Sequence, residues 1–295
     1  MQKIIPHLWF DTQARQAAEF YTSLFSDGQI NWVYTITDTP SGNAELIEFQ
    51  LGNMTLAAIS AGPYFKLNES MSFMVTVSTK EEIDRLYHSL SEEGRILMPL
   101  GEYDFNSYYV WVEDRFGLSW QLALSLDQKS PYHLDISLLF SQEQVGLAEP
   151  FLEKYQSGLK DASIGFVSYY PQGSVPSAKA HLNYGELLIA DQKIIVMDHG
   201  YGGESSFNEA FSLMIYVDTQ EEADELYHLL SRVPDAEQCG WVKDEFGVSW
   251  QIVPRSLMTA YEGTKPETLK ILNDAILEMK RIDVNRINNI LSNNS

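Results

Sequence analysis

The stretch WVEDRFGLSWQL, from Trp111 to Leu122, returns almost unchanged as WVKDEFGVSWQI, from Trp241 to Ile252. Eight of the twelve positions are identical. The Asp and Gly in the middle of each copy favour a tight turn, because Gly accepts positive φ and Asp hydrogen-bonds to its own backbone. The aromatic and β-branched flanks favour extended chain. Each copy therefore predicts a hairpin, and the chain is predicted to hold two related modules.

A second repeated segment supports the duplication. Asn68 to Leu90 aligns without gaps on Asn208 to Leu230, with 13 of 23 positions identical. Thr79 and Thr219 each precede a glutamate by three residues, which predicts a capping box at the start of a helix. The offset between copies is 140 here and 130 at the hairpin, so the second copy lacks ten residues between its helix and its hairpin.

The first half of each module is fainter in the repeat. Gly52-Asn53 aligns with Asp191-Gln192, and the His7 to Phe10 segment aligns with Ser137 to Phe140. A polar segment, Glu92 to Ser107, is predicted to be a loop. Hydrophobic periodicity predicts helices at Thr12–Phe25 and Lys80–Ser91 and strands at Ile4–Phe10, Ile30–Thr37, Leu46–Leu51, Met54–Ser60 and Phe73–Val77.

Three parts of the chain are expected: a first module at 1–126, a second at 131–262, and a helical appendage at 263–295. The short linker, Asp127 to Tyr132, favours two modules packed together. Thr264 and Glu267 predict another capping box, and an apolar stripe follows them. We expect this tail to form a strap over the modules or a dimer contact.

Composition narrows the class of protein. With 20 Lys and Arg against 41 Asp and Glu, the net charge is −21, which disfavours nucleic acid and anionic membrane surfaces as partners. Cys239 is the single cysteine, so no intrachain disulfide forms, as expected in a reducing compartment. No apolar run approaches the length needed to cross a bilayer, and no signal peptide is evident. We expect a cytoplasmic protein, either a monomer or a homodimer, with a small-molecule ligand.

Three groups of segments resemble the PhnB-like family of the vicinal-oxygen-chelate (glyoxalase/bleomycin-resistance/dioxygenase) superfamily. They are PHLWFDTQARQAAEFYTSLF at Pro6 to Phe25, FKLNESMSFMV and FNEAFSLMI at Phe65 to Val75 and Phe207 to Ile215, and both hairpins. The resemblance implies an α+β fold of tandem βαβββ modules, with curved mixed sheets around a shared groove and a C-terminal helical tail. Relatives often carry a 3-demethylubiquinone-9 3-methyltransferase label.

In metal-dependent members of this superfamily, the ion is held by residues from the first and last strands of each module. The corresponding positions here lie near His7 and Ser137 and at Gln121 and Gln251. This set contains no carboxylate to offset the desolvation of a divalent ion. We therefore favour a groove without a metal or other cofactor, in which these residues bind a small organic ligand. Three aromatic residues, Trp9, Trp111 and Trp241, are further candidates for the groove.

An alternative is a divalent-metal-dependent lyase, isomerase or dioxygenase. It would use His7, Gln121 and Gln251 with a carboxylate from Glu48 or Asp135. His133, Asp135 and Ser137 alternate onto one strand face, and His181 is another candidate ligand. A third possibility is a structural or regulatory module whose tail binds a partner.

Methyltransferase activity is disfavoured. The segment IIVMDHGYGG, at Ile194 to Gly203, superficially resembles a cofactor-binding loop, but that loop requires a helix directly after it. The sequence that follows predicts another strand instead.

Overall fold

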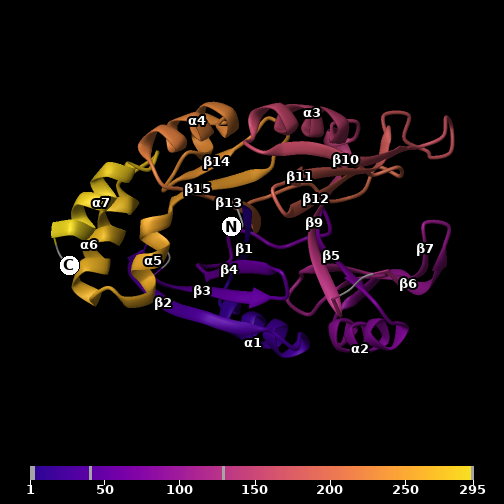
Figure 1. Ribbon diagram of the computed structural model, residues 1–295, viewed down its shortest axis with the longest axis horizontal. Helices are drawn as coiled ribbons and strands as arrows, with labels where there is room; N and C mark the ends of the chain where they lie inside the picture. The colour runs from indigo at the N-terminus through magenta and orange to yellow at the C-terminus, as the bar shows by residue number, and fades with distance from the viewer. Residues whose placement is uncertain (1–3, 40–41, 128–129, 294–295) are drawn as a thin grey trace.

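The computed structural model describes residues 4–39, 42–127 and 130–293, and these form two curved mixed sheets flanked by helices (Figure 1). Sheet A has seven strands and sheet B has eight. In spatial order, sheet A consists of β14 (Trp241–Lys243), β15 (Ser249–Pro254), β13 (Phe211–Val217), β1 (Ile4–Phe10), β4 (Met54–Ser60), β3 (Gly42–Leu51) and β2 (Gln29–Thr39). Sheet B consists of β10 (Ala162–Tyr169), β11 (Leu182–Ile189), β12 (Gln192–Asp198), β9 (Tyr132–Phe140), β5 (Met71–Val77), β8 (Ser119–Leu124), β7 (Asn106–Glu113) and β6 (Arg95–Tyr103).

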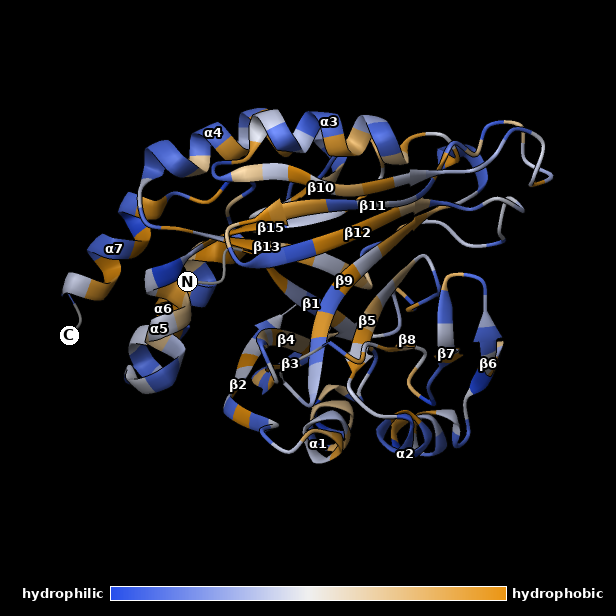
Figure 2. Cartoon of the chain, turned by 45° about the vertical axis from the view of Figure 1, so that its right-hand side comes forward, coloured by the Kyte–Doolittle hydropathy of each residue, from blue (hydrophilic) through white to orange (hydrophobic). Residues whose placement is uncertain are grey.

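Each sheet combines half of one sequence copy with half of the other. Strands β1 to β4 of the first copy join β13 to β15 of the second in sheet A, and β5 to β8 join β9 to β12 in sheet B. The copies meet at two antiparallel pairs, β1 with β13 and β5 with β9. Figure 2 shows β9 and β5 side by side at the second of these junctions. The expected modules, 1–126 and 131–262, are therefore units of sequence that each contribute to both sheets.

Four helices of the repeat pack on the sheets and close the cores. They are α1 (Ala14–Leu24), α2 (Lys80–Ser91), α3 (Ala148–Gly158) and α4 (Gln220–Leu230), and short 3₁₀ turns lie at Gln142–Gln144 and Pro234–Ala236. Thr79 and Thr219 accept hydrogen bonds from the amides of Glu82 and Glu222 at 3.3 and 3.2 Å. Both predicted N-caps are therefore confirmed.

The repeated hairpin is held by its buried aspartate. Asp244 Oδ1 accepts from the amides of Phe246 and Val248, both at 2.9 Å. Asp244 Oδ2 accepts from Trp250 Nε1 at 2.9 Å and from the Tyr155 hydroxyl at 2.6 Å. Asp114 makes the same amide and indole contacts in the first copy. The stretch that marks the repeat thus ties a turn to a buried tryptophan.

The glycines of both hairpin turns adopt the positive φ that was predicted for them. Gly117 and Gly247 both have a φ of 86°, in the region that L side chains rarely adopt. The hairpin prediction is therefore confirmed in both copies, by antiparallel pairs β7 with β8 and β14 with β15.

Within the repeated modules, two details of the sequence interpretation are wrong. The Glu92–Ser107 segment contains strand β6, whose pairing with β7 is interrupted at three places, so its periodicity is obscured. The turn equivalent to Gly52-Asn53 is Ala190-Asp191, one residue earlier than aligned. Gly52 and Ala190 share a φ of 55°, and the alignment failed because alanine replaces glycine at this left-handed position.

The C-terminal tail consists of three helices, α5 (Arg255–Gly263), α6 (Pro266–Leu277) and α7 (Val284–Asn293). Helix α5 follows β15 directly and so crosses the expected boundary at residue 263. The predicted capping box at Thr264 is wrong, because Lys265 is the N-cap of α6 and makes no side-chain cap bond. The tail lies beside β2 and α4 at one end of the molecule (Figure 1). The amides of Cys239 and Gly240 donate to the carbonyls of Met279 and Lys280 at 2.8 and 3.0 Å. These bonds attach the C-terminal tail to the second sequence copy.

Candidate ligand sites on the open faces of the two sheets

Strand register defines two equivalent rows of side chains, one on each sheet. Cα partners on neighbouring strands project from the same face, so each row shares one face. This face, which lies opposite the helix-packed cores and is called the open face below, carries the predicted polar residues. The alternate positions, such as Phe73 and Trp120, are buried in the helix-packed cores. The rows are Glu48, Ala57, His7 and Ser212 on sheet A, and Glu186, Ile195, Ser137 and Ser72 on sheet B.

On sheet A, Ser212 links His7 to Gln251. Gln251 Nε2 donates to Ser212 Oγ at 2.9 Å, and Ser212 Oγ lies 3.4 Å from His7 Nδ1. His7 is 3% exposed, and burial lowers its pKa to about 3. The imidazole is therefore neutral at physiological pH and offers a hydrogen bond without a charge.

Aromatic side chains surround His7. The His7 ring meets Trp241 edge-on, with centroids 5.6 Å apart, and Trp241 lies 6.4 Å from Trp9. Trp9 also contacts Phe65 at 5.2 Å and donates its Nε1 hydrogen to the Gly62 carbonyl at 2.8 Å. Trp9 and Trp241 thus lie together beside His7, on the same face of sheet A.

Glu48 stands two strands away from His7 in the same row. It accepts from Asn31 Nδ2 at 3.0 Å and from the Tyr216 hydroxyl at 3.4 Å. Burial is the largest influence on this carboxyl and raises its pKa above the ordinary value. Glu48 is therefore a partnered acid whose ionised form is disfavoured.

The protein's own tail covers this end of sheet A. Tyr261 of α5 packs on Trp32 and Tyr34 of β2, with ring centroids 5.6 and 4.8 Å apart. Trp32 is the Cα partner of Glu48, so this contact lies on the open face. Asn273 of α6 accepts from the Tyr261 hydroxyl at 2.7 Å and donates to the Tyr34 hydroxyl at 3.2 Å. The tail helices therefore occupy the part of the face nearest β2.

On sheet B, Gln121 is held by three neighbours. Its Nε2 donates to Ser72 Oγ at 2.8 Å and to Ser137 Oγ at 3.3 Å, and its Oε1 accepts from the Tyr109 hydroxyl at 2.6 Å. The orientation of the amide is fixed by these bonds. Gln121 and Tyr109 come from the first copy and Ser137 from the second, so the network spans the junction of the copies.

Beside this network lies an ionic cluster. Lys193 Nζ is 3.1 Å from Asp135 Oδ2 and 3.4 Å from Glu186 Oε1. The Tyr184 hydroxyl donates to Glu186 Oε1 at 3.0 Å, and His133 Nε2 lies 3.2 Å from Asp135 Oδ1. Asp135 is 1% exposed, so its carboxylate is buried with these partners.

Exposed aromatic rings flank the cluster on both sides. Phe105 is 66% exposed and contacts Tyr109, and Phe166 is 63% exposed and contacts Tyr184, at centroid distances of 5.0 and 6.0 Å. Exposed aromatic rings next to a buried polar floor are typical of a surface that receives a ligand.

The structure brings some of the predicted residues together and separates others. His7 joins Gln251 on sheet A, and Gln121 joins Ser137 on sheet B. The two glutamines thus lie on different sheets, because the strands of each copy divide between them. The alternative metal-ligand set is also divided, because His7 and Gln251 lie on sheet A and Gln121 lies on sheet B. Trp111 lies on sheet B, where its Nε1 donates to Ser119 Oγ at 2.7 Å.

Sequence reasoning missed several members of these sites. Ser72 and Ser212 fall inside the second repeated segment, where only their recurrence could have marked them. Glu186 is the register equivalent of Glu48, a relation hidden by the one-residue error at the Ala190 turn. His181 lies elsewhere, with Nδ1 2.9 Å from Glu149 Oε2.

The donor sets do not fit a divalent ion. On sheet A, Glu48 is the carboxylate of the row, and a raised pKa opposes the ionised form that a metal requires. On sheet B, Asp135 and Glu186 already contact the Lys193 ammonium. Across the residues that the structure describes, no group of three or more His, Cys, Asp and Glu side chains is placed to hold a metal.

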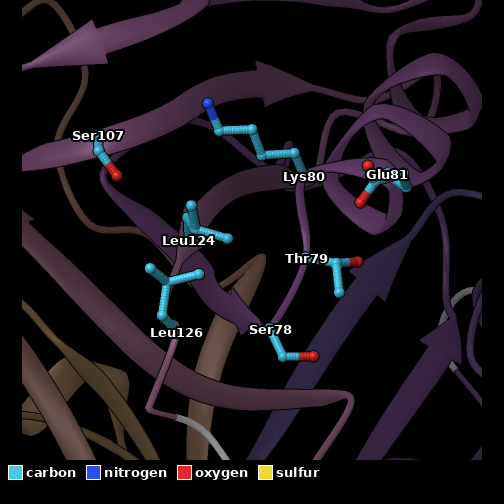
Figure 3. A pocket seen from close by; sticks show the side chains of 7 residues that line it. All are labelled: Ser78, Thr79, Lys80, Glu81, Ser107, Leu124 and Leu126. Carbon is cyan, nitrogen blue, oxygen red and sulfur yellow. The ribbon is translucent and has the colours of Figure 1, made fainter.

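Two surface hollows lie apart from these networks. One, of about 530 Å³, is lined by Thr79, Lys80, Ser107, Leu124 and their neighbours at the start of α2 (Figure 3). The other, of about 550 Å³, is lined by Trp9, Phe65, Arg95, Arg115 and adjacent residues. Of the predicted site residues, Trp9 lines the second hollow.

Two further observations concern membrane-spanning helices and the segment compared above with a methyltransferase loop. In the described part of the chain, no helix has the length and apolar character needed to span a membrane. Residues 199–210, which follow β12, contain no helix and lead into β13.

Comparison with known proteins identifies the relatives. The family model described as 3-demethylubiquinone-9 3-methyltransferase matches twice, at residues 2–123 and 133–253. A proposed 3-demethylubiquinone-9 3-methyltransferase, the PhnB protein of Bacillus cereus, is 36% identical over 42% of this chain and 100% of its own, with a TM-score of 0.40. No curated protein matches.

Two structures share the fold over most of the chain. Glyoxalase I from Zea mays is 14% identical over 88% of this chain and 95% of its own, with a TM-score of 0.55. A proposed dioxygenase from Bacillus subtilis is 10% identical over 96% of this chain and 94% of its own, with a TM-score of 0.52. The chain therefore belongs to the PhnB-like family, whose model is described as 3-demethylubiquinone-9 3-methyltransferase, and is a tandem protein with the vicinal-oxygen-chelate fold.

Proposed function

We propose that this protein binds a small organic ligand on the open face of sheet B, where the two sequence copies meet. The observation that carries the proposal is the polar network of Gln121 with Ser72, Ser137 and Tyr109 beside the buried Asp135 cluster. A buried polar floor costs stability unless each group is satisfied, and fixed donors and acceptors give a ligand its orientation.

The surroundings favour a ligand with both apolar and polar parts. Phe105 and Phe166 offer exposed rings, and the partly exposed Met74 lies on the same face as Gln121. An aromatic or aliphatic body would pack on these side chains, while a polar end would reach the hydrogen-bonding floor. Sheet A is a weaker candidate, since Tyr261 of the tail already covers the rings of Trp32 and Tyr34.

The proposal includes no catalytic metal and no methyl transfer. The carboxylates that could hold an ion are partnered, and no helix follows β12 to form a nucleotide-type loop. Both sheets are completed within one chain, which favours a monomer, and the single cysteine fits a cytoplasmic location. S-adenosylmethionine is expected not to bind in the micromolar range, and calorimetric titration measures this directly.

A fragment screen with matched variants tests the ligand site. Saturation-transfer NMR with neutral oxygenated aromatic fragments should give hits on the wild-type protein. Gln121→Leu should abolish or weaken them, because it removes the donor to both serines. Gln251→Leu is the control, since Gln251 occupies the equivalent place on sheet A.

Thermal unfolding of both variants verifies that each is folded before binding is compared. Equal weakening by both variants, or weakening by Gln251→Leu alone, would refute the placement on sheet B. Persistent binding to Gln121→Leu would refute the role of the network.

A further inference from the structure

Lys193 lies between two carboxylates on the open face of sheet B. Its Nζ is 3.1 Å from Asp135 Oδ2 and 3.4 Å from Glu186 Oε1. The three side chains come from adjacent strands, β9, β12 and β11. The exposed fractions of the side chains alone are 28% for Lys193, 2% for Asp135 and 18% for Glu186, so the lysine side chain is the most accessible of the three.

The electrostatics keep this lysine charged. Burial alone would lower the pKa of Lys193, but Asp135 and Glu186 together outweigh that effect and raise it. Without the ammonium, two carboxylates would face each other on a partly buried surface, which costs free energy through repulsion and desolvation.

The equivalent positions on sheet A show that this arrangement is particular to sheet B. By strand register, Ile5 on sheet A is equivalent to Asp135 on sheet B, and Thr55 is equivalent to Lys193. The glutamate is present on both sheets, as Glu48 and Glu186. A lysine and a second carboxylate therefore occur together on sheet B, while sheet A has neither at those positions.

We propose that the Lys193 ammonium occupies a cation site formed by the carboxylates of Asp135 and Glu186, which we call the cation seat. We further propose that this ammonium binds an uncharged oxygen of the ligand. An ammonium has three N–H donors. Two carboxylate oxygens lie within 3.4 Å of Nζ, which leaves N–H capacity for a ligand carbonyl or hydroxyl. The cluster of two carboxylates and one ammonium has a net charge of −1, which disfavours a carboxylate ligand. The ligand part rests on the proposed function, whereas the cation seat stands on its own geometry.

Removing the lysine should convert the seat into a metal site. Lys193→Ala leaves Asp135 and Glu186 facing a space of ammonium size, and carboxylate oxygens bind divalent transition ions. We expect wild-type protein to bind no stoichiometric Co²⁺ and Lys193→Ala to bind one equivalent, measured by calorimetry and visible absorption. Asp135→Asn in the Lys193→Ala background should abolish that binding.

Lys243→Ala is the matched control. Lys243 Nζ lies 2.5 Å from Glu209 Oε1, so its removal frees a surface carboxylate in a simple pair and should create no Co²⁺ site. If Lys193→Ala does not fold, Lys193→Gln serves as a neutral replacement of similar length, and Co²⁺ should raise its melting temperature.

Two results would refute the proposal that Lys193 occupies a cation site. One is stoichiometric Co²⁺ binding by the wild-type protein that is lost in Asp135→Asn; the other is a folded Lys193→Ala that binds no Co²⁺. For the ligand, Lys193→Ala should weaken the binding of a neutral carbonyl fragment by about tenfold, as expected for loss of a charge-assisted hydrogen bond. If Lys193→Ala binds Co²⁺ but Gln121→Leu leaves fragment binding unchanged, the seat stands and the ligand site lies elsewhere.

Discussion

Substitution of Asp244 by asparagine tests how the repeated hairpin is stabilised. Asparagine keeps an oxygen for the amides of Phe246 and Val248 but places an NH₂ group against Trp250 Nε1. An unsatisfied buried donor costs about 1 to 3 kcal/mol. The substitution also removes a carboxyl whose ionised form is penalised by burial, which raises its pKa to about 6 from 3.8. The two effects oppose each other at neutral pH.

The pH dependence separates these effects. Because the folded pKa of Asp244 is raised, its contribution to stability is fully present below pH 3.8 and is lost as the pH rises through about 6. This difference in pKa between the folded and unfolded states corresponds to roughly 3 kcal/mol as an upper bound. The stability of the wild-type protein relative to Asp244→Asn should therefore increase as the pH falls from 7 to 4.

Urea denaturation at pH 4, 5, 6 and 7 measures this difference, because the other carboxyl groups titrate in both proteins. Asp114→Asn should behave in the same way, since burial raises the pKa of Asp114 to about 6 as well. A stability difference that stays constant, or that shrinks as the pH falls, would refute the reasoning.

Three further outcomes follow from the structure. Tyr261→Ala should destabilise the tail by about 3 to 5 kcal/mol, since a buried aromatic side chain packed on Trp32 and Tyr34 is lost; faster hydrogen exchange in α5 and α6 checks this, and unchanged exchange contradicts it. The His7 ring should show no titration between pH 5 and 8 in ¹⁵N NMR, because burial lowers its pKa to about 3; a midpoint in that range would show that the ring is solvated. Thr219→Ala should cost about 1 kcal/mol in chemical denaturation through loss of the helix cap, whereas Thr264→Ala should be neutral.

Local features of the fold could be predicted from the sequence. The two hairpins and the caps at Thr79 and Thr219 depend on residues within a few positions of each other, so their patterns carry the information directly. The resemblance to the PhnB-like family added the tandem arrangement of curved sheets.

The pairing of the copies could not be predicted in the same way. Which strand of one copy joins which strand of the other depends on contacts between residues far apart in sequence, such as His7 with Ser212. For this reason the sequence could place Gln121 and Gln251 at equivalent positions without showing that they belong to different sheets. Lys193 gave no repeat signal, because its sheet A equivalent is Thr55.

The most direct test of the ligand site on sheet B is the crystal structure of the wild-type protein with its best neutral fragment. We expect the fragment to lie on the open face of sheet B, with an oxygen atom within hydrogen-bonding distance of Lys193 Nζ and its body against Phe105 or Phe166. A fragment bound instead beside His7 on sheet A, or in the hollow at the start of α2, would contradict the placement of the ligand on sheet B.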